Sequence, residues 1–144
     1  MVRSALLILV GLAGCLSQGV FASAASPQLQ VKVAGIKSDK GVIVVRIFSD
    51  EQGWLKNDKA IETLKLTPQG NEIATTIALK PGTYAVHVFQ DENSNGKLDM
   101  KWLPPGPAEP WVVSNNAQGT MGPPSFKDAK VQIEADQTLQ LSLQ

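Results

Sequence analysis

The sequence predicts an all-β domain, an antiparallel β-sandwich of immunoglobulin or transthyretin-like architecture with about seven strands. Apolar and polar residues alternate with a period of two in most segments after residue 28, and turn-forming residues separate these segments. No segment shows the period of about 3.6 residues that an amphipathic helix requires. A barrel is the alternative arrangement of the same strands.

The first half of the domain predicts four strands. In 29–34, Leu29, Val31 and Val33 alternate with other residues up to a turn at Gly35. The run 42–48 is apolar on both faces for most of its length, which is typical of a central strand covered on both sides. A polar, turn-rich stretch follows, and further short strands are expected in the segments 61–67 and 73–79.

The second half predicts one more long strand, an irregular excursion and two closing strands. In 84–89, alternate residues including His87 share one face of the strand. The proline-rich stretch 104–110 must be a loop or an edge crossing, because proline lacks the amide proton of a sheet ladder. The segments 131–133 and 139–144 return to alternation and close the domain.

Composition indicates one ordinary globular domain and excludes several partners. The 144 residues are 43% hydrophobic and 18% charged, with 13 basic and 13 acidic side chains. The balanced charge and the absence of a Lys/Arg cluster argue against nucleic acid as a partner. No apolar run after the N-terminal segment reaches about eighteen residues, so no transmembrane segment is expected in the mature chain.

The N-terminal segment is typical of a bacterial signal peptide, with a short cationic start and an apolar stretch over 5–16. Two processing sites compete. Small residues ending at Ala24 predict a signal peptide of 1–24 and a soluble domain of 25–144, in the periplasm or secreted. The alternative is a lipoprotein signal of 1–14, since the sequence before Cys15 resembles a lipobox. A lipidated Cys15 would anchor the domain to a membrane.

The loop 91–99 is the best candidate site. Oxygen-bearing side chains stand at its positions one, three and five, a glycine at six and a carboxylate at nine, as in the front of an EF-hand calcium loop. The expected ligands are the side chains of Asp91, Asn93, Asn95 and Asp99 with the carbonyl of Lys97. Hard oxygen donors favour calcium over zinc or copper.

Two features weaken the calcium interpretation of this loop. The twelfth position, a bidentate Glu in an EF-hand, is Trp102, so two negative charges remain and affinity would be weak, roughly 0.1 to 1 mM. The pair Asn95-Gly96 is also a strong hairpin-turn signal without any ion.

Two further motifs follow the loop, Ser-Asn-Asn-Ala-Gln-Gly at 114–119 and Met-Gly-Pro-Pro-Ser-Phe-Lys-Asp-Ala at 121–129. Together with the loop at 91–99, and in this order, they resemble the bacterial domain-of-unknown-function 2141 family, over about Leu29 to the C-terminus. The resemblance implies an exported β-sandwich domain and carries no assigned activity. As turn-forming residues alone, these motifs would hold a long loop together by hydrogen bonds or line a polar recess, with Phe126 as an apolar anchor.

The remaining chemistry-bearing residues form no recognisable catalytic set. A general base at His87 needs an orienting partner, and the chain has one His and no cysteine after Cys15. A paired-carboxylate hydrolase using Asp91, Glu92 and Asp99 is the formal enzymatic alternative.

The tryptophans either cover the ends of the sandwich or form an aromatic platform. The candidate partner surface comprises Trp102, Trp111, Asn115 and Asn116. We therefore expect a non-enzymatic envelope module, stabilised by calcium at the 91–99 loop, whose partner is an unidentified envelope protein or polysaccharide. A carbohydrate-binding accessory domain and a small hydrolase are the alternatives.

Overall fold

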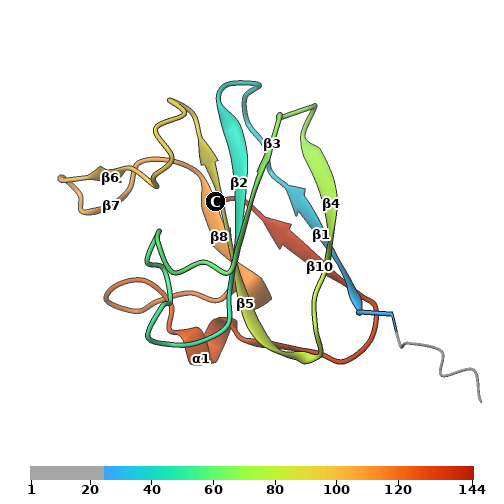
Figure 1. Ribbon diagram of the computed structural model, residues 1–144. Helices are drawn as coiled ribbons and strands as arrows, with labels where there is room; N and C mark the ends of the chain where they lie inside the picture. Colours follow the sequence, from blue (N-terminus) through green and yellow to red (C-terminus); the bar gives the residue numbers. More distant parts are fainter. Residues whose placement is uncertain (1–24) are drawn as a thin grey trace, which may run out of the picture.

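The computed structural model describes residues 25–144 as two packed β-sheets with long loops on one side (Figure 1). The expected signal peptide, with its competing sites at Ala24 and Cys15, lies outside the described residues. The all-β sandwich class predicted from the alternating pattern is confirmed.

One sheet has three strands in the order β10-β1-β4. Its central strand β1 (Gln28–Ala34) pairs with β4 (Glu72–Ala78) in antiparallel fashion and with β10 (Gln137–Ser142) in parallel. This parallel pair departs from the fully antiparallel sandwich that was expected. Residue periodicity locates strands in a chain but does not specify which strands become neighbours.

The other sheet has the order β3-β2-β5-β8, and its strands are antiparallel. Its members are β3 (Glu62–Leu66), β2 (Val42–Phe48), β5 (Gly82–Asp91) and β8 (Trp111–Val113). The strand β9 (Val131–Ile133) pairs with the beginning of β5. Strand β5 extends further than the expected 84–89 segment and reaches Asp91, which places the 91–99 loop at its end.

The main core lies between the two sheets. From β1, the side chains of Leu29, Val31 and Val33 point into it, and Val86 and Val88 meet them from β5. Burial of these aliphatic groups is the dominant favourable contribution to folding, at about 25 cal/mol per Å² of apolar surface. The alternation read from the sequence therefore identifies the inner faces correctly.

Strands β2 and β5 are buried on their outer faces as well. On that side a second apolar cluster, formed by Ala85, Val113 and Ala129, is covered by Trp54 and Phe126 among others. Phe126 begins the four-residue helix α1 (Phe126–Ala129), and Ser125 caps this helix by accepting a hydrogen bond from the amide of Asp128. The covering on both sides predicted for 42–48 is confirmed, and loops provide the outer cover.

Besides α1, three further features were not predicted from the sequence. Strand β8 completes the second sheet, a short 3₁₀ turn η1 (Ser114–Asn116) follows it, and a small hairpin projects from the domain (Figure 1). The hairpin pairs β6 (Met100–Lys101) with β7 (Gly106–Pro107). Its second strand lies inside the proline-rich stretch, at an isolated edge where a missing amide proton is tolerated.

Candidate functional site: a cavity over His87 and the 91–99 loop

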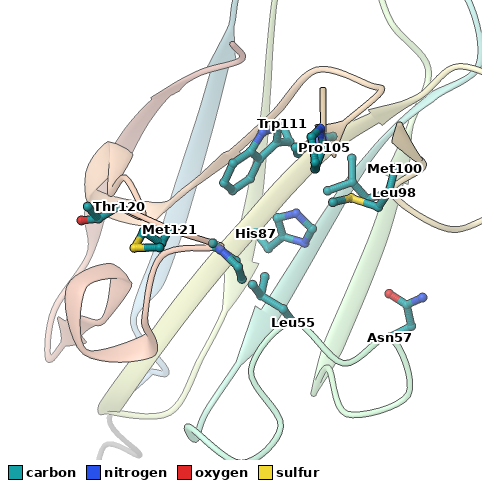
Figure 2. Close-up of a pocket in the computed structure, with 13 residues that line it drawn as sticks. Leu55, Asn57, His87, Leu98, Met100, Pro105, Trp111, Thr120 and Met121 are labelled. Carbon is teal, nitrogen blue, oxygen red and sulfur yellow. The ribbon is translucent and has the colours of Figure 1, made fainter. Parts of the chain in front are cut away.

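A cavity of about 750 Å³ opens on the outer face of the second sheet. Its floor is the β5–β8 region, and its walls come from the 49–60 loop, the 92–110 excursion and the 117–125 segment. Figure 2 shows the ring of His87 among the side chains of Trp111, Leu98 and Leu55. The lining residues are Leu55, Asn57, His87, Leu98, Met100, Pro105, Gly106, Pro107, Trp111, Thr120, Met121, Gly122 and Pro123.

His87 is the unusual polar group of this cavity. The side chain is 4% exposed, and neither ring nitrogen has a hydrogen-bond partner. The ring stacks on Phe89 at 5.2 Å between centroids and meets Trp111 edge-on at 6.3 Å. Burial, and then the charge of Arg46, lower the pKa of His87 from 6.5 to about 3, so the imidazole is neutral at physiological pH.

Arg46 lies opposite His87 in the β2–β5 ladder and is 6% exposed. Its guanidinium donates to the side-chain oxygen of Asn57 and, at 2.7 Å, to the carbonyl of Gly96. It also lies 5.1 Å from the centre of the Phe89 ring, in cation–π range. Desolvation lowers the pKa of Arg46, and the nearby Asp91 charge opposes that shift. One side chain thus ties two walls of the cavity to the sheet.

Trp54 ties the 49–60 loop to the 117–125 segment. Its indole N–H donates to the carbonyl of Pro124 at 2.9 Å, and its ring contacts Phe48 and Phe126 edge-on. The next residue, Leu55, lines the cavity with φ at 59°, a backbone conformation that is unfavourable for leucine. Such outliers persist where the surrounding structure enforces them, as it does here.

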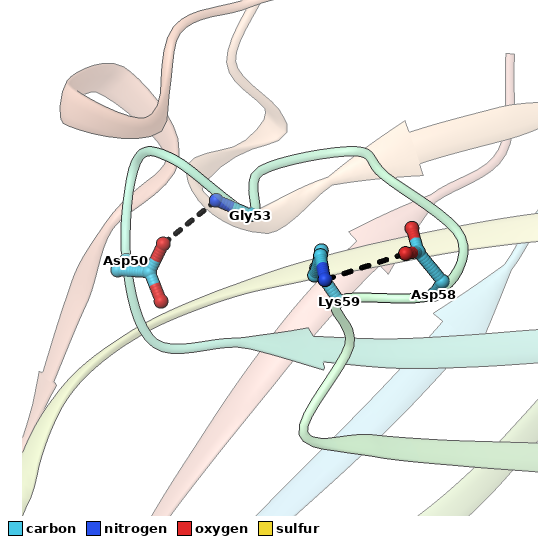
Figure 3. A network of polar contacts seen from close by, with 4 residues as sticks. All are labelled: Asp50, Gly53, Asp58 and Lys59. Carbon is cyan, nitrogen blue, oxygen red and sulfur yellow. Dashed lines mark hydrogen bonds and ion pairs between the residues drawn. The ribbon is translucent and has the colours of Figure 1, made fainter.

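Figure 3 shows how the 49–60 loop is held internally. A carboxylate oxygen of Asp50 accepts a hydrogen bond from the amide of Gly53 at 2.7 Å. An exposed ion pair joins Lys59 to Asp58 at 3.4 Å, and pairs of this kind contribute little to stability. The loop is therefore shaped mainly by Asp50 and by the anchoring of Trp54.

In the 91–99 loop, the first predicted ligand is fully buried. Asp91 is 0% exposed, and its carboxylate oxygens accept hydrogen bonds from the amides of Asn95 and Gly96 at 3.0 and 2.7 Å. These bonds fold the loop back over the end of β5. Each carboxylate oxygen keeps a free lone pair after accepting one bond.

The other predicted side chains meet at Asp99. Its carboxylate accepts from the side-chain amide nitrogens of Asn93 and Asn95, the latter at 2.9 and 3.0 Å. The carbonyl oxygens of these two amides accept from the backbone amides of Asn95 and Lys97 at 3.0 and 2.8 Å. Asn93 and Asn95 thus contact Asp99 through their nitrogens, and Asp91 bonds backbone amides at the start of the loop.

Glu109, which lies outside the 91–99 loop, stabilises it through hydrogen bonds. This residue was not identified from the sequence. It is 7% exposed, and its carboxylate accepts from the amides of Glu92 and Asp99 at 2.9 and 3.0 Å. Because Glu109 stands among prolines far along the chain, no local pattern marked it. Arg46 had a signal that went unused, since it is the one charged residue in the apolar run 42–48.

The 91–99 loop offers a hard cation oxygen ligands of which only a few are charged. Within 25–144, no group of three or more His, Cys, Asp or Glu side chains is placed to hold a metal ion. A calcium ion would therefore depend on Asp91 and Asp99 supplemented by the neutral oxygens of Asn93 and Asn95. In this structure the nitrogens of Asn93 and Asn95 face Asp99, so both amides would have to turn over for their oxygens to join Asp99 around an ion.

The residues of the predicted partner surface are not brought together. Trp102 projects from the hairpin and is 92% exposed, whereas Trp111 lines the cavity. Asn115 donates at 3.0 Å to the carbonyls of Asp128 and Lys130. Asn116 bonds backbone groups of β10, so both amides fasten the 3₁₀ turn to neighbouring segments.

The family model described as "uncharacterized protein conserved in bacteria (DUF2141)" matches residues 31–140. No curated protein and no solved structure matches the chain. In the part of the chain that the structure covers, no helix has the length and apolar character to cross a bilayer.

Proposed function

Because the chain belongs to the DUF2141 family of uncharacterised bacterial proteins, we propose its function from its own site: an exported envelope module that binds a partner and catalyses no reaction. One observation carries this proposal. The cavity over His87 is lined mainly by apolar side chains and contains no carboxylate.

The chemistry of His87 supports binding rather than proton transfer. A general base needs a pKa near the working pH and a partner that orients it. His87 has a pKa of about 3, and its ring nitrogens have no partner. Asp91 lies on the same strand but uses its carboxylate to hold the amides of Asn95 and Gly96.

A hydrolysis screen tests the absence of catalysis. Chromogenic esters, glycosides and phosphates would be offered to the purified domain from pH 5 to 8. We expect rates equal to those of two variants, His87→Phe and Asp99→Asn. A wild-type rate well above either variant would overturn the proposal and favour the small hydrolase.

Calcium at the 91–99 loop is the second part of the proposal. The closeness of the Asn93, Asn95 and Asp99 side chains supports it, since turning over the two amides would present their oxygens beside the Asp99 carboxylate. A weak site with two charges would suit a compartment outside the cytoplasm, since calcium sites of extracellular modules have dissociation constants of about 0.1 to 1 mM.

The calcium proposal is tested by thermal melts of the domain in calcium and in EDTA. We expect a higher Tm in calcium, and no difference for Asp99→Asn. That variant suits the test better than Asp91→Ala, since Asp91 is buried and bonds two backbone amides. The control Asp58→Asn removes the same charge from an exposed position outside the loop and should keep the calcium response. Identical wild-type melts would end the calcium proposal.

Export is supported by the cationic start and the apolar stretch of the N-terminal segment. Fractionation of expressing cells and mass measurement of the product test both processing routes. Release of a domain beginning at Ala25 would support the soluble form, and a lipid-modified N-terminus at Cys15 the anchored form. A full-length chain found only in the cytoplasm would overturn export.

Carbohydrate binding is favoured by one specific observation, the exposure of Trp102 on the projecting hairpin. An exposed indole can stack on a sugar ring, although this structure places no second exposed indole beside it. Retention of the domain on immobilised envelope polysaccharides, lost in Trp102→Ala, would support this candidate. Equal elution of both proteins would count against it.

A further inference from the structure

We propose that the cavity over His87 binds an uncharged, mainly apolar molecule that carries a hydroxyl group, of the size of a substituted phenol or a ring alcohol. This inference rests on the proposed binding function and specifies its ligand class.

The size and lining select a small apolar ligand. A volume of about 750 Å³ lies within the range of about 300 to 1,000 Å³ typical of small-molecule sites. Apolar side chains from four separate segments face the cavity, including Leu55, Leu98, Pro105, Trp111 and Met121. A flat partner surface would not require such a concave, apolar shape.

The absence of charge in the lining argues against an ionic ligand. None of the lining residues is Asp, Glu, Lys or Arg, and the polar ones are Asn57, His87 and Thr120. An ion bound here would lose its water without gaining a counter-charge, which is strongly unfavourable. The nearest buried cation, Arg46, is already bonded to Asn57 and Gly96.

The two unpartnered nitrogens of His87 favour a ligand with a hydroxyl group. A neutral imidazole has one N–H donor and one acceptor nitrogen, and a buried polar group normally has a partner for each. Both nitrogens of His87 lack a partner, although the side chain is buried and lines the cavity. Neither nitrogen is open to solvent in this structure, so a ligand hydroxyl reaches the imidazole only when a neighbouring side chain of the rim moves aside. The hydroxyl can then donate to one nitrogen or accept from the other.

The walls that hold this arrangement are fixed from outside the cavity. Arg46 joins the walls that carry Asn57 and Gly96, and Trp54 joins the 49–60 loop to Pro124. A largely preformed site loses less freedom on binding. At the rim, Met121 is 100% exposed, and a flexible thioether there can adapt to ligands of different outline.

The test compares three probes with one ring system: 1-naphthol, naphthalene and naphthalene-1-sulfonate. Equilibrium dialysis at neutral pH against the mature domain measures each affinity. We expect 1-naphthol to bind about tenfold more tightly than naphthalene, the effect of one good hydrogen bond. The sulfonate should bind least. Equal affinities for naphthol and naphthalene, or preference for the sulfonate, would overturn the proposal.

Variants locate the binding. His87→Phe should keep naphthalene affinity and remove the preference for 1-naphthol. The control Tyr84→Phe removes a polar group from the opposite face of the same strand, where its hydroxyl donates to the carbonyl of Lys80, and should keep the preference. A preference that survives His87→Phe would show that another group recognises the hydroxyl and would overturn the role of His87.

A second pair of variants tests the cavity itself. Leu98→Trp should fill the space and abolish binding of both neutral probes, whereas Lys97→Trp adds the same ring at an exposed neighbour outside the lining. Equal Tm values would show that both variants fold. Probe binding that persists in Leu98→Trp would place it elsewhere, and binding of no probe by the wild type would also reject the ligand class. Either result leaves partner binding through another surface unaffected.

Discussion

Arg46 and His87 face each other across β2 and β5, and the two buried side chains differ in what they bond. Arg46 donates to Asn57 and Gly96 and stacks over Phe89. His87 bonds to nothing through either nitrogen. The pair therefore combines a group that fastens the cavity walls with a group that is left unsatisfied at the cavity floor.

Replacing the unsatisfied histidine should stabilise the domain. We expect His87→Phe to raise the free energy of unfolding by about 1 to 3 kcal/mol, because an unpaired buried polar group costs about that much. Urea titration at neutral pH measures the change. An equal or lower stability would mean that the nitrogens have partners in solution.

The same histidine should make stability depend on pH. The unfolded chain binds a proton at His87 near pH 6.5, whereas the folded chain does so near 3, because burial and Arg46 disfavour the charge. Between these values only the unfolded state is protonated, so stability falls as pH decreases, by up to about 1.4 kcal/mol per unit. The full contribution is present above pH 6.5.

The wild-type minus His87→Phe difference isolates this effect from the other ionisable groups of the chain. Denaturant titrations from pH 7 to 4 should show the difference growing steadily as pH falls. A difference that stays constant with pH would contradict the assigned cause.

Replacing the guanidinium of Arg46 by an ammonium should make the 49–60 and 91–99 loops more mobile. Arg46→Lys keeps the charge, but an ammonium cannot reproduce the planar geometry that reaches Asn57 and Gly96 together. We expect a loss of about 1 to 3 kcal/mol and faster amide exchange in the 91–99 loop. The control Lys65→Ala changes an exposed residue of β3 and should alter stability by less than about 0.5 kcal/mol. Unchanged exchange would argue against fastening by Arg46.

The hydroxyl of Ser114 connects two segments in the interior. It accepts from the amide of Val86 at 2.9 Å and donates to the carbonyl of Ala129. Ser114→Ala leaves both groups unpaired and should cost about 2 to 4 kcal/mol. Ser142→Ala, at an exposed serine, should cost less than about 0.5 kcal/mol. Urea midpoints compare the two, and similar values would contradict the assigned bonds.

Two glycines with nearly the same positive φ provide a matched test of packing at the end of β5. Gly41 and Gly70 have φ of 68° and 66°. A Cβ at Gly41 would lie 1.8 Å from the carbonyl oxygen of Asp91, whereas one at Gly70 would meet nothing within 4 Å. Gly70→Ala should therefore cost about 1 kcal/mol through backbone strain alone.

Gly41→Ala carries the same strain and also displaces Asp91, so it should cost several times more, and any calcium response should be lost. Thermal melts in calcium and in EDTA provide both readings. Equal destabilisation by the two substitutions would show that the backbone at Asp91 moves freely.

The sequence predicted the parts of the fold that depend on local pattern. The apolar run 42–48 indicated a strand covered on both sides, and alternation around His87 placed it on the face opposite Val86. Strand β8 was not predicted, because three residues between Pro110 and a turn are too few to show a period. The parallel pairing of β1 with β10 was not predicted either, because strand pairing depends on the whole sheet.

Of the two candidate sites, the one formed by a contiguous segment could be predicted from the sequence and the other could not. The 91–99 loop was visible, since its polar side chains are contiguous in the chain. The cavity was not, because its lining comes from residues as distant as Leu55 and Pro123. A single burial pattern cannot indicate that loops from three parts of the chain will enclose a space over one strand.

The central place of β1 between β4 and β10 also determines how late the domain can complete its folding. The first strand of the described domain has the last one as its parallel neighbour, with Leu29 opposite Gln137 and Ala34 opposite Ser142. Contacts this distant in sequence slow folding, because a long loop must close before they form. Until residue 142 is free to pair, one edge of β1 stays open and the three-stranded sheet cannot be completed.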